Sequence, residues 1–186
     1  MGAQAAFSIS NSTLTNAVGT SITLTTTGGS GSGAVTYALS TANALCSLSG
    51  ATVTASQPTQ CSVVATKAAQ GLYASKTSAA VIFIFKGPQA TLTVSNTTRT
   101  NAVGTSVTLT TAGGAGSGAV TYALQSPAAN CTLTDGVLGA TAAASCVVTA
   151  SKAQDSIFVV SNTATKNFTF LAAQDLLSIT NSTLVH

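Results

Sequence analysis

Four cysteines are the residues of this chain whose type and spacing best define a chemistry. Cys46 and Cys61 lie 15 residues apart, and Cys131 and Cys146 repeat that separation after a shift of 85 residues. Four cysteines permit three pairings, and the shift selects the one that keeps each pair within its own unit. Because small secreted domains with limited cores commonly use disulfides, we expect two bridges and an extracellular location. The alternative is four reduced, buried thiols.

Catalytic and metal-binding chemistry has few candidates. The single histidine is the last residue, His186, the chain has no Glu, and its three Asp residues are Asp135, Asp155 and Asp175. These residues form no Ser-His-Asp set and no paired carboxylates, and the cysteines lack CxxC-type zinc spacing. A calcium site needs several oxygen ligands, with carboxylates prominent. We therefore expect no enzyme activity, no cofactor and no metal.

The charge pattern argues against two classes of partner. Net charge is +3, and the six cationic residues are scattered, whereas nucleic-acid binding needs Lys and Arg clustered on one face. No segment approaches the run of about 18 apolar residues that a membrane helix needs. We expect no nucleic-acid partner and no membrane insertion. The N-terminus lacks the pattern of a signal peptide, which favours an excerpt of a longer array.

A repeat positions the cysteines. The sequence of Asn16–Leu39 returns almost unchanged at Asn101–Leu124, and SISNSTL at residues 8–14 returns as SITNSTL at residues 178–184, two shifts later. A fixed period without insertions indicates an array of like units. The expected organisation is one repeat over residues 1–87, a second over 88–173 and the first strand of a third over 174–186.

Each unit is predicted to be all-β, because apolar residues alternate with Thr and Ser between clusters rich in Gly, Asn and Ser. Residues 11–20 are expected to form a connection, and residues 70–76 a loop. About seven short strands in 85 residues fit an immunoglobulin-like β-sandwich. The predicted fold is therefore two tandem sandwiches of this type. The predicted strands of the first unit are Phe7–Ile9, Ile22–Leu24, Val35–Leu39, Cys46–Leu48, Thr52–Ala55, Cys61–Ala65 and Ala80–Lys86.

The pattern GxVTYxL after a Gly-rich turn, followed by Cys-x-Leu and by Cys-x-Val-x-Ala-x-Lys, covers nearly all of both units. This combination resembles the bacterial immunoglobulin-like repeats of very large secreted surface proteins and adhesins. The resemblance implies a non-enzymatic stalk or spacer at the bacterial cell surface, with neighbouring copies of the repeat as partners.

The Gly-rich turns are the second candidate site. They lack the ending of a phosphate-binding loop and open no helix, so strand connection is the simpler function. The alternative is a binding tip for glycans or a host surface. The glycines concerned are Gly28, Gly29, Gly31 and Gly33, with Gly113, Gly114, Gly116 and Gly118 at the equivalent positions.

Asn-x-Ser/Thr triplets begin at five asparagines. Because those that recur at the period follow from duplication, we interpret them as polar turns rather than glycan acceptors. The five are Asn11, Asn96, Asn130, Asn167 and Asn181.

Two features suggest assembly. Phe83 and Phe85 should face the core, which turns Ile82 and Ile84 outward on a last strand, where exposed apolar residues favour contact with another unit or chain. The tail carries Leu177 and Ile179 in the pattern of a first strand. Two readings of the tail stay open: a frayed end, or a strand added to the next molecule, which would build a head-to-tail filament.

Overall fold

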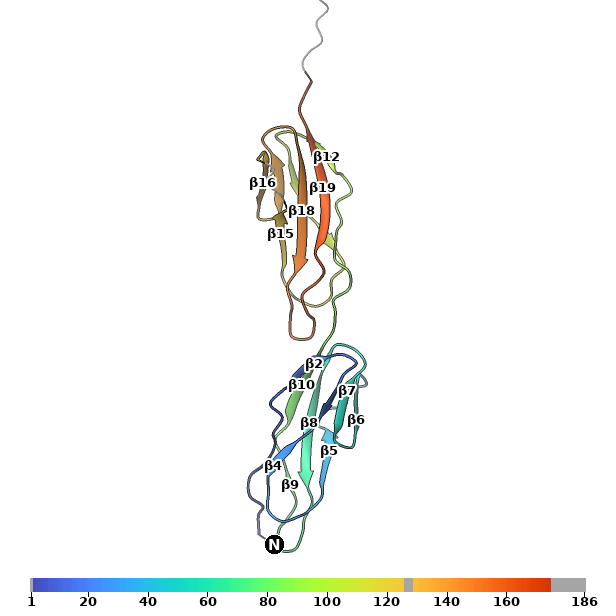
Figure 1. Cartoon of the computed structure of the whole chain (residues 1–186), viewed down its shortest axis with the longest axis vertical. Coiled ribbons are helices and arrows are strands. Elements are labelled where there is room, and N and C mark those ends of the chain that lie inside the picture. Colours follow the sequence, from blue (N-terminus) through green and yellow to red (C-terminus); the bar gives the residue numbers. More distant parts are fainter. Residues whose placement is uncertain (1, 126–128, 175–186) are drawn as a thin grey trace, which may run out of the picture. The chain divides into compact units, whose positions relative to one another are not determined.

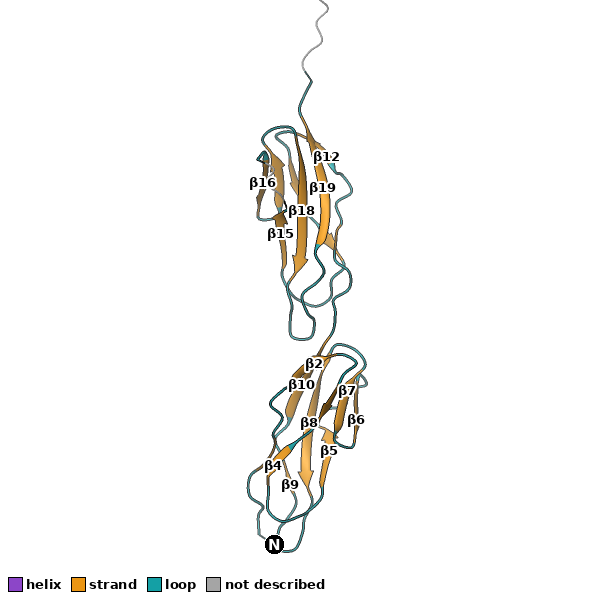
Figure 2. Cartoon of the chain, viewed as in Figure 1, coloured by secondary structure: helices purple, strands orange, loops and turns teal. Residues whose placement is uncertain are grey.

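The computed structural model describes residues 2–125 and 129–174, in which every regular element is a β-strand (Figure 1; Figure 2). The predicted third-repeat strand, with Leu177 and Ile179, lies outside these residues. Two compact units are formed: one by residues 1–90 with 115–118 and 153–161, the other by residues 91–114, 119–152 and 162–186. We call the strands before residue 90 the first sandwich and those after it the second sandwich.

The first sandwich has two facing sheets. One sheet has the strand order β2-β10-β8-β5, with the short β9 also paired to β8, and the other face is formed by β3-β7-β6 and by the pair β1-β4. The strands are β1 (Phe7–Ile9), β2 (Thr15–Ala17), β3 (Ser21–Thr23), β4 (Thr26–Gly28), β5 (Val35–Leu39), β6 (Cys46–Ser49), β7 (Thr52–Ala55), β8 (Thr59–Lys67), β9 (Lys76–Thr77) and β10 (Val81–Lys86).

The second sandwich repeats this arrangement. Its sheets have the orders β12-β19-β18-β15 and β13-β17-β16, with the pair β11-β14 beside the latter. Each half is an immunoglobulin-like β-sandwich, as the sequence predicts. The strands are β11 (Thr93–Val94), β12 (Thr100–Ala102), β13 (Ser106–Thr108), β14 (Thr111–Ala112), β15 (Val120–Leu124), β16 (Cys131–Thr134), β17 (Val137–Ala140), β18 (Ala144–Lys152) and β19 (Ala164–Leu171).

Alternation of side chains builds the core. Along β8, Cys61, Val63 and Ala65 are fully buried while their neighbours are partly exposed. The strand β10 adds Phe83 and Phe85, also fully buried. Because successive side chains of a strand point to opposite faces, this period of two puts one apolar face of each sheet against the other. The second sandwich has the same core from the equivalent positions: Cys146, Val148, Ala150, Phe168 and Phe170.

The connection predicted over residues 11–20 is partly wrong. It contains β2, which pairs in parallel with β10, with Thr15 opposite Ile84. The sequence gave no signal for β2 because Thr15–Ala17 has no apolar alternation. The strand β10 is consequently an inner strand of its sheet and not an edge. The short strands β4 and β9 were missed for the same reason.

An asparagine braces the break between β3 and β4. The side chain of Asn11 donates to the carbonyl of Thr23 (2.7 Å) and accepts from the amide of Thr25 (2.9 Å). Between these two residues, the carbonyl of Leu24 accepts a hydrogen bond from the Tyr37 hydroxyl (3.3 Å). Asn96 and Tyr122 make the same contacts in the second sandwich. Two of the glycosylation-like triplets therefore begin with asparagines that satisfy backbone groups.

Candidate functional site

Each sandwich contains one disulfide that joins its two sheets. Cys46 begins β6 and bonds to Cys61 of β8, 15 residues away, and Cys131 bonds to Cys146 in the same way. The β8 and β18 cysteines are fully buried, whereas Cys46 and Cys131 are half-buried. No cysteine is free. Sheets that share an apolar core are thus also linked covalently.

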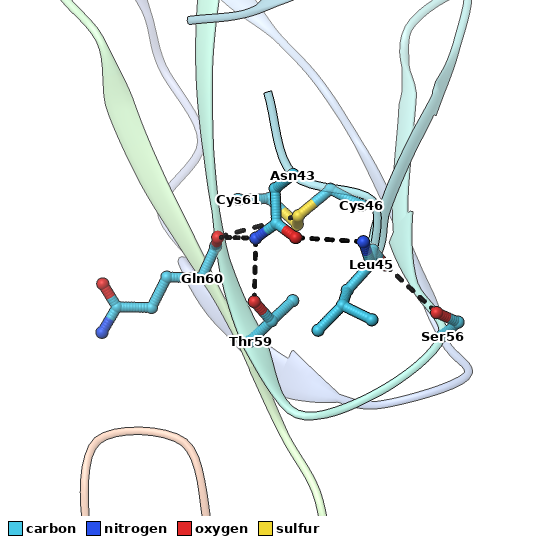
Figure 3. The surroundings of a disulfide bond; sticks show 7 residues. All are labelled: Asn43, Leu45, Cys46, Ser56, Thr59, Gln60 and Cys61. Carbon is cyan, nitrogen blue, oxygen red and sulfur yellow. Dashed lines mark hydrogen bonds between the residues drawn. A yellow bond between two sulfur atoms is a disulfide. The ribbon is translucent and has the colours of Figure 1, made fainter. Parts of the chain in front are cut away.

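Around the first disulfide, the side chain of Asn43 connects the segment before β6 to β8 (Figure 3). Its amide nitrogen donates to the hydroxyl of Thr59 (2.9 Å) and to the carbonyl of Gln60 (3.1 Å), and its oxygen accepts from the amide of Leu45 (3.0 Å). Three hydrogen bonds from one side chain hold the half-exposed Cys46 side of the bridge against β8. This site is structural and leaves no reactive group open to a substrate.

Close packing of the main chain explains the Gly-rich turns. A Cβ atom at Gly28 would lie 2.0 Å from the carbonyl oxygen of Ala6, and one at Gly113 would lie 1.9 Å from that of Thr91. Both glycines also have positive φ, which favours glycine. The amide of Gly29 donates to Ala6 (2.8 Å). The turns are held against their own sandwich, and their use as binding tips stays a prediction.

A carboxylate organises the loops next to the second Gly-rich turn. Asp155 accepts hydrogen bonds from the amides of Ser117 (2.7 Å), Ile157 (2.9 Å) and Phe158 (2.8 Å). These amides, that of Ser117 first, lower the pKa of Asp155 because they stabilise the charged form. At the equivalent place in the first sandwich, the neutral side chain of Gln70 accepts from the amide of Ser32 (2.8 Å).

The predicted outward pair on β10 divides. Ile82 is 50% exposed, but Ile84 is only half-buried and lies beside β2. Its strand is flanked by β8 on one side and β2 on the other. Backbone pairing at this place is therefore closed, and only the side chain of Ile82 offers an apolar contact on this face. The role of both residues in assembly stays a prediction.

An open sheet edge is the candidate site that sequence analysis missed. The strand β5 ends its sheet, as β15 does in the second sandwich, and each pairs with one neighbour among the described strands. Beside each strand runs a groove, of about 340 Å³ in the first sandwich and about 550 Å³ in the second. The first groove is lined by Val35, Thr36, Tyr37, Leu48, Gly50 and Ala51, and the equivalents of all six line the second. The repetition of VTYAL was visible in the sequence, but strand order was needed to place it at an edge.

Within residues 2–125 and 129–174, no three His, Cys, Asp or Glu side chains gather into a group able to hold a metal ion. Across the same residues, no helix is long and apolar enough to cross a membrane. The arrangement of described side chains offers packing, covalent cross-linking and an open backbone edge.

No family model matches the chain, and no curated protein matches it. Among solved structures it is similar to Drosophila N-cadherin EC1-4, with a TM-score of 0.46 and 10% identity, over 91% of this chain and 50% of that one. It is also similar to the D0-D1 domain of intimin (TM-score 0.32, 16% identity, 89% and 98%). A third is the surface layer protein SbsC, domains 1-6 (0.36, 13%, 94% and 29%). The chain spans half of the cadherin chain. Because these TM-scores are below 0.5, the fold rests on the chain's own strands.

Proposed function

We propose that this chain is a structural, non-enzymatic repeat module that serves as stalk or spacer of an extracellular, bacterial cell-surface or adhesion protein. Its repeats are proposed to occupy residues 1–87 and 88–173, with a third beginning at 174. The strands β10 and β19 end at Lys86 and Leu171, which supports these boundaries.

One observation carries the proposal: the two copies share what the fold needs. The common features are the disulfide, the buried Phe pair and the glycines at close backbone contacts. The ionisable side chains that could support chemistry are not shared, since Asp135 and Asp155 stand where the first repeat has Gly50 and Gln70. Duplication that keeps the scaffold alone is what a spacer requires, because its output is length.

The disulfides support the extracellular part of the proposal. Stable structural bridges form in oxidising compartments and are rare in the cytosol. Mass spectrometry of chain exported to an oxidising compartment should show both pairs bonded. Finding reduced thiols there would contradict this part.

The spacer function is tested by changing the number of repeats. Small-angle scattering should give a maximum dimension that grows by a constant increment when chains of two, four and six repeats are compared. A chain with flexible Gly/Ser segments inserted at residues 87–88 is the control, because flexible linkers extend only as the square root of their length. A dimension that levels off with added repeats would contradict the spacer function.

The finer proposal is that copies polymerise head to tail through the C-terminal strand that contains Leu177 and Ile179. Light scattering should give long particles for the intact chain and a monomer for a chain that ends at Gln174. Substituting Ile82→Asn and Ile84→Thr, the residues of the second repeat, should reduce any association that these side chains support. A monomeric intact chain at every concentration would contradict polymerisation and leave the spacer function standing.

The alternative function is binding of glycans or a host surface by the Gly-rich turns. The internal hydrogen bonds of Gly29 and Ser117 occupy backbone donors that such a ligand would use. Binding on a glycan array that disappears when both turns are shortened would favour this alternative over a spacer.

A further inference from the structure

Of the strands that end a sheet, β5 and β15 have the longest open edge. Each is five residues long, whereas β2 and β12 at the opposite ends have three. The sequence VTYAL contains no charged residue and no proline. Native proteins commonly protect exposed edges with Lys, Pro or a bulge, because a free edge is a template for strand addition. These two edges are unprotected in both repeats.

The free backbone groups of β5 can be assigned from its register. Val35 lies opposite Lys67, and the amides of Ala68 and Ser40 bond to the carbonyls of Ala34 and Ser62. In an antiparallel pair, hydrogen-bonded and non-bonded positions alternate along the strand. Even-numbered residues therefore bond to β8. The amides and carbonyls of Val35, Tyr37 and Leu39 face away from it.

The same assignment holds in the second sandwich. The amide of Gln125 bonds to the carbonyl of Val147, so Val120, Tyr122 and Leu124 present their amides and carbonyls to the free edge of β15. Each edge thus offers three donors and three acceptors at the spacing of an incoming strand.

The grooves lie where the side chains of an incoming strand would enter. Leu48 and Ala51, from the facing sheet, line the first groove together with Tyr37. Because a strand points alternate side chains to opposite faces, one set of side chains of an added strand would enter the groove and the other set would face solvent. An apolar alternating strand fits such a site better than a charged one.

The first-strand positions of both sandwiches are already occupied. The strand β1 pairs with β4 and buries Phe7, and β11 pairs with β14 and buries Leu92. A further strand of the first-strand type therefore has no vacancy in either sandwich. The open places with both free backbone groups and an adjoining groove are the edges of β5 and β15.

We propose that these edges receive residues 175–186 from another copy of the chain. This inference rests on the proposed polymerisation and names its acceptor. Twelve residues of chain follow the described part, more than enough to span a five-residue edge. Their sequence, DLLSITNSTLVH, alternates Leu177 and Ile179 with polar residues and has ionisable side chains only at its two ends. The match is therefore one of length, alternation and lack of charge.

A peptide of residues 175–186 tests the acceptor directly. Titrated into a chain that ends at Gln174, the fluorescently labelled peptide should show saturable binding by polarisation. A peptide of the same composition in scrambled order is the control. Absence of binding at millimolar chain would overturn the proposal.

Backbone methylation shows whether binding is strand addition. One peptide is N-methylated at Leu177, Ile179 and Asn181, and the other at Ser178, Thr180 and Ser182. Because the amides of only one set face the edge, one peptide should bind at least about tenfold more weakly than the other. Equal binding by the two peptides would overturn strand addition.

Matched lysine variants locate the acceptor. The pair Val35→Lys and Val120→Lys places a charge in each groove and should weaken peptide binding about tenfold or more. The control pair Ala80→Lys and Thr165→Lys adds the same charge at equivalent exposed positions on or next to β10 and β19, and should bind like the parent. Circular dichroism and protection of the two disulfides from alkylation verify folding. Unchanged binding by the folded groove variants would overturn the assignment.

The outcome separates this inference from the proposed function. If the intact chain forms long particles while the groove variants also do so, polymerisation stands and the acceptor is wrong. If the intact chain is monomeric and the peptide does not bind, both polymerisation and the acceptor are wrong, and the spacer function is unaffected.

Discussion

The two sandwiches have the same core but different polar surroundings. Phe83 and Phe168, like Phe85 and Phe170, are each at most 1% exposed. The two disulfides close the same separation of 15 residues. Apolar packing inside a small sandwich depends on volume and tolerates few changes. The core therefore stays constant between copies while the connections vary.

The connections differ in how they satisfy polar groups. Asn43, Thr59 and Gln60 surround the first disulfide, and the second repeat has Ala128, Ala144 and Ser145 at these places. The amide oxygen of Gln70 becomes the carboxylate of Asp155. The second sandwich therefore carries a loop whose hydrogen bonds depend on ionisation, and the first carries additional neutral bonds beside its bridge.

Strand length differs as well. In the first sandwich, the hydroxyl of Ser78 accepts from the amide of Ala65 (3.0 Å), and β10 pairs with β8 only from Val81 onward. In the second, Ala164 lies opposite Ala150 and the ladder is longer. One buried side-chain hydrogen bond thus takes the place of a backbone pair. The fold accepts either solution because the amide is satisfied in both.

The largest expected effect tests whether the cores are equivalent. Phe83→Ala and Phe168→Ala should each lower the free energy of unfolding of their own sandwich by about 3–5 kcal/mol, because each removes a fully buried ring. Hydrogen exchange of peptides from each sandwich in the whole chain measures the two separately. Losses that differ by more than a factor of two would show that the cores are not equivalent.

Removal of the bridges should have the next largest effect. The double substitutions Cys46→Ala with Cys61→Ala, and Cys131→Ala with Cys146→Ala, each open a loop of 15 residues and should cost about 3 kcal/mol. The same exchange measurement applies. A loss well below 1 kcal/mol in either sandwich would mean that its bridge adds little to stability.

Asn43→Ala makes the first disulfide resemble the second. We expect a loss of about 1–2 kcal/mol in the first sandwich, since three hydrogen bonds of a half-buried side chain are removed. Alkylation after graded reduction should also trap Cys46 at a lower concentration of reductant than in the parent. Ser56→Ala is the control, because its side-chain hydrogen bond to Leu45 is longer (3.4 Å). Equal behaviour of both variants would remove any special role for Asn43.

The smallest effect concerns pH. The pKa of Asp155 is lowered in the folded chain, so its ionisation adds stability above its unfolded pKa of about 3.9, and that stability is lost as pH falls through the lower folded value. The amide resonance of Ser117 should therefore titrate below about pH 4, whereas that of Ser32, bonded to Gln70, should not. Asp155→Asn should abolish the titration. A midpoint above the ordinary Asp value would contradict this.

Sequence analysis predicted the strands with apolar alternation and missed those without it. The strand over Cys61–Ala65 was found because inward and outward residues alternate. The strands β2 and β9 were missed because Thr15–Ala17 and Lys76–Thr77 lack such alternation and form only where a neighbouring strand supplies their partners. The interpretation of β10 as a last strand with an open side was wrong for this reason, and the open edge at β5 was not predicted.

By itself, the sequence determined the repeat, the all-β class, the pairing of the cysteines and the core faces of the long strands. These follow from a fixed period and from local alternation, which need no knowledge of neighbours. Only the tertiary structure decided strand order, and with it which edge is covered by β2 and which is left open at β5. Hydrogen bonding between strands joins residues far apart in the chain, so no local pattern specifies which backbone groups stay unpaired.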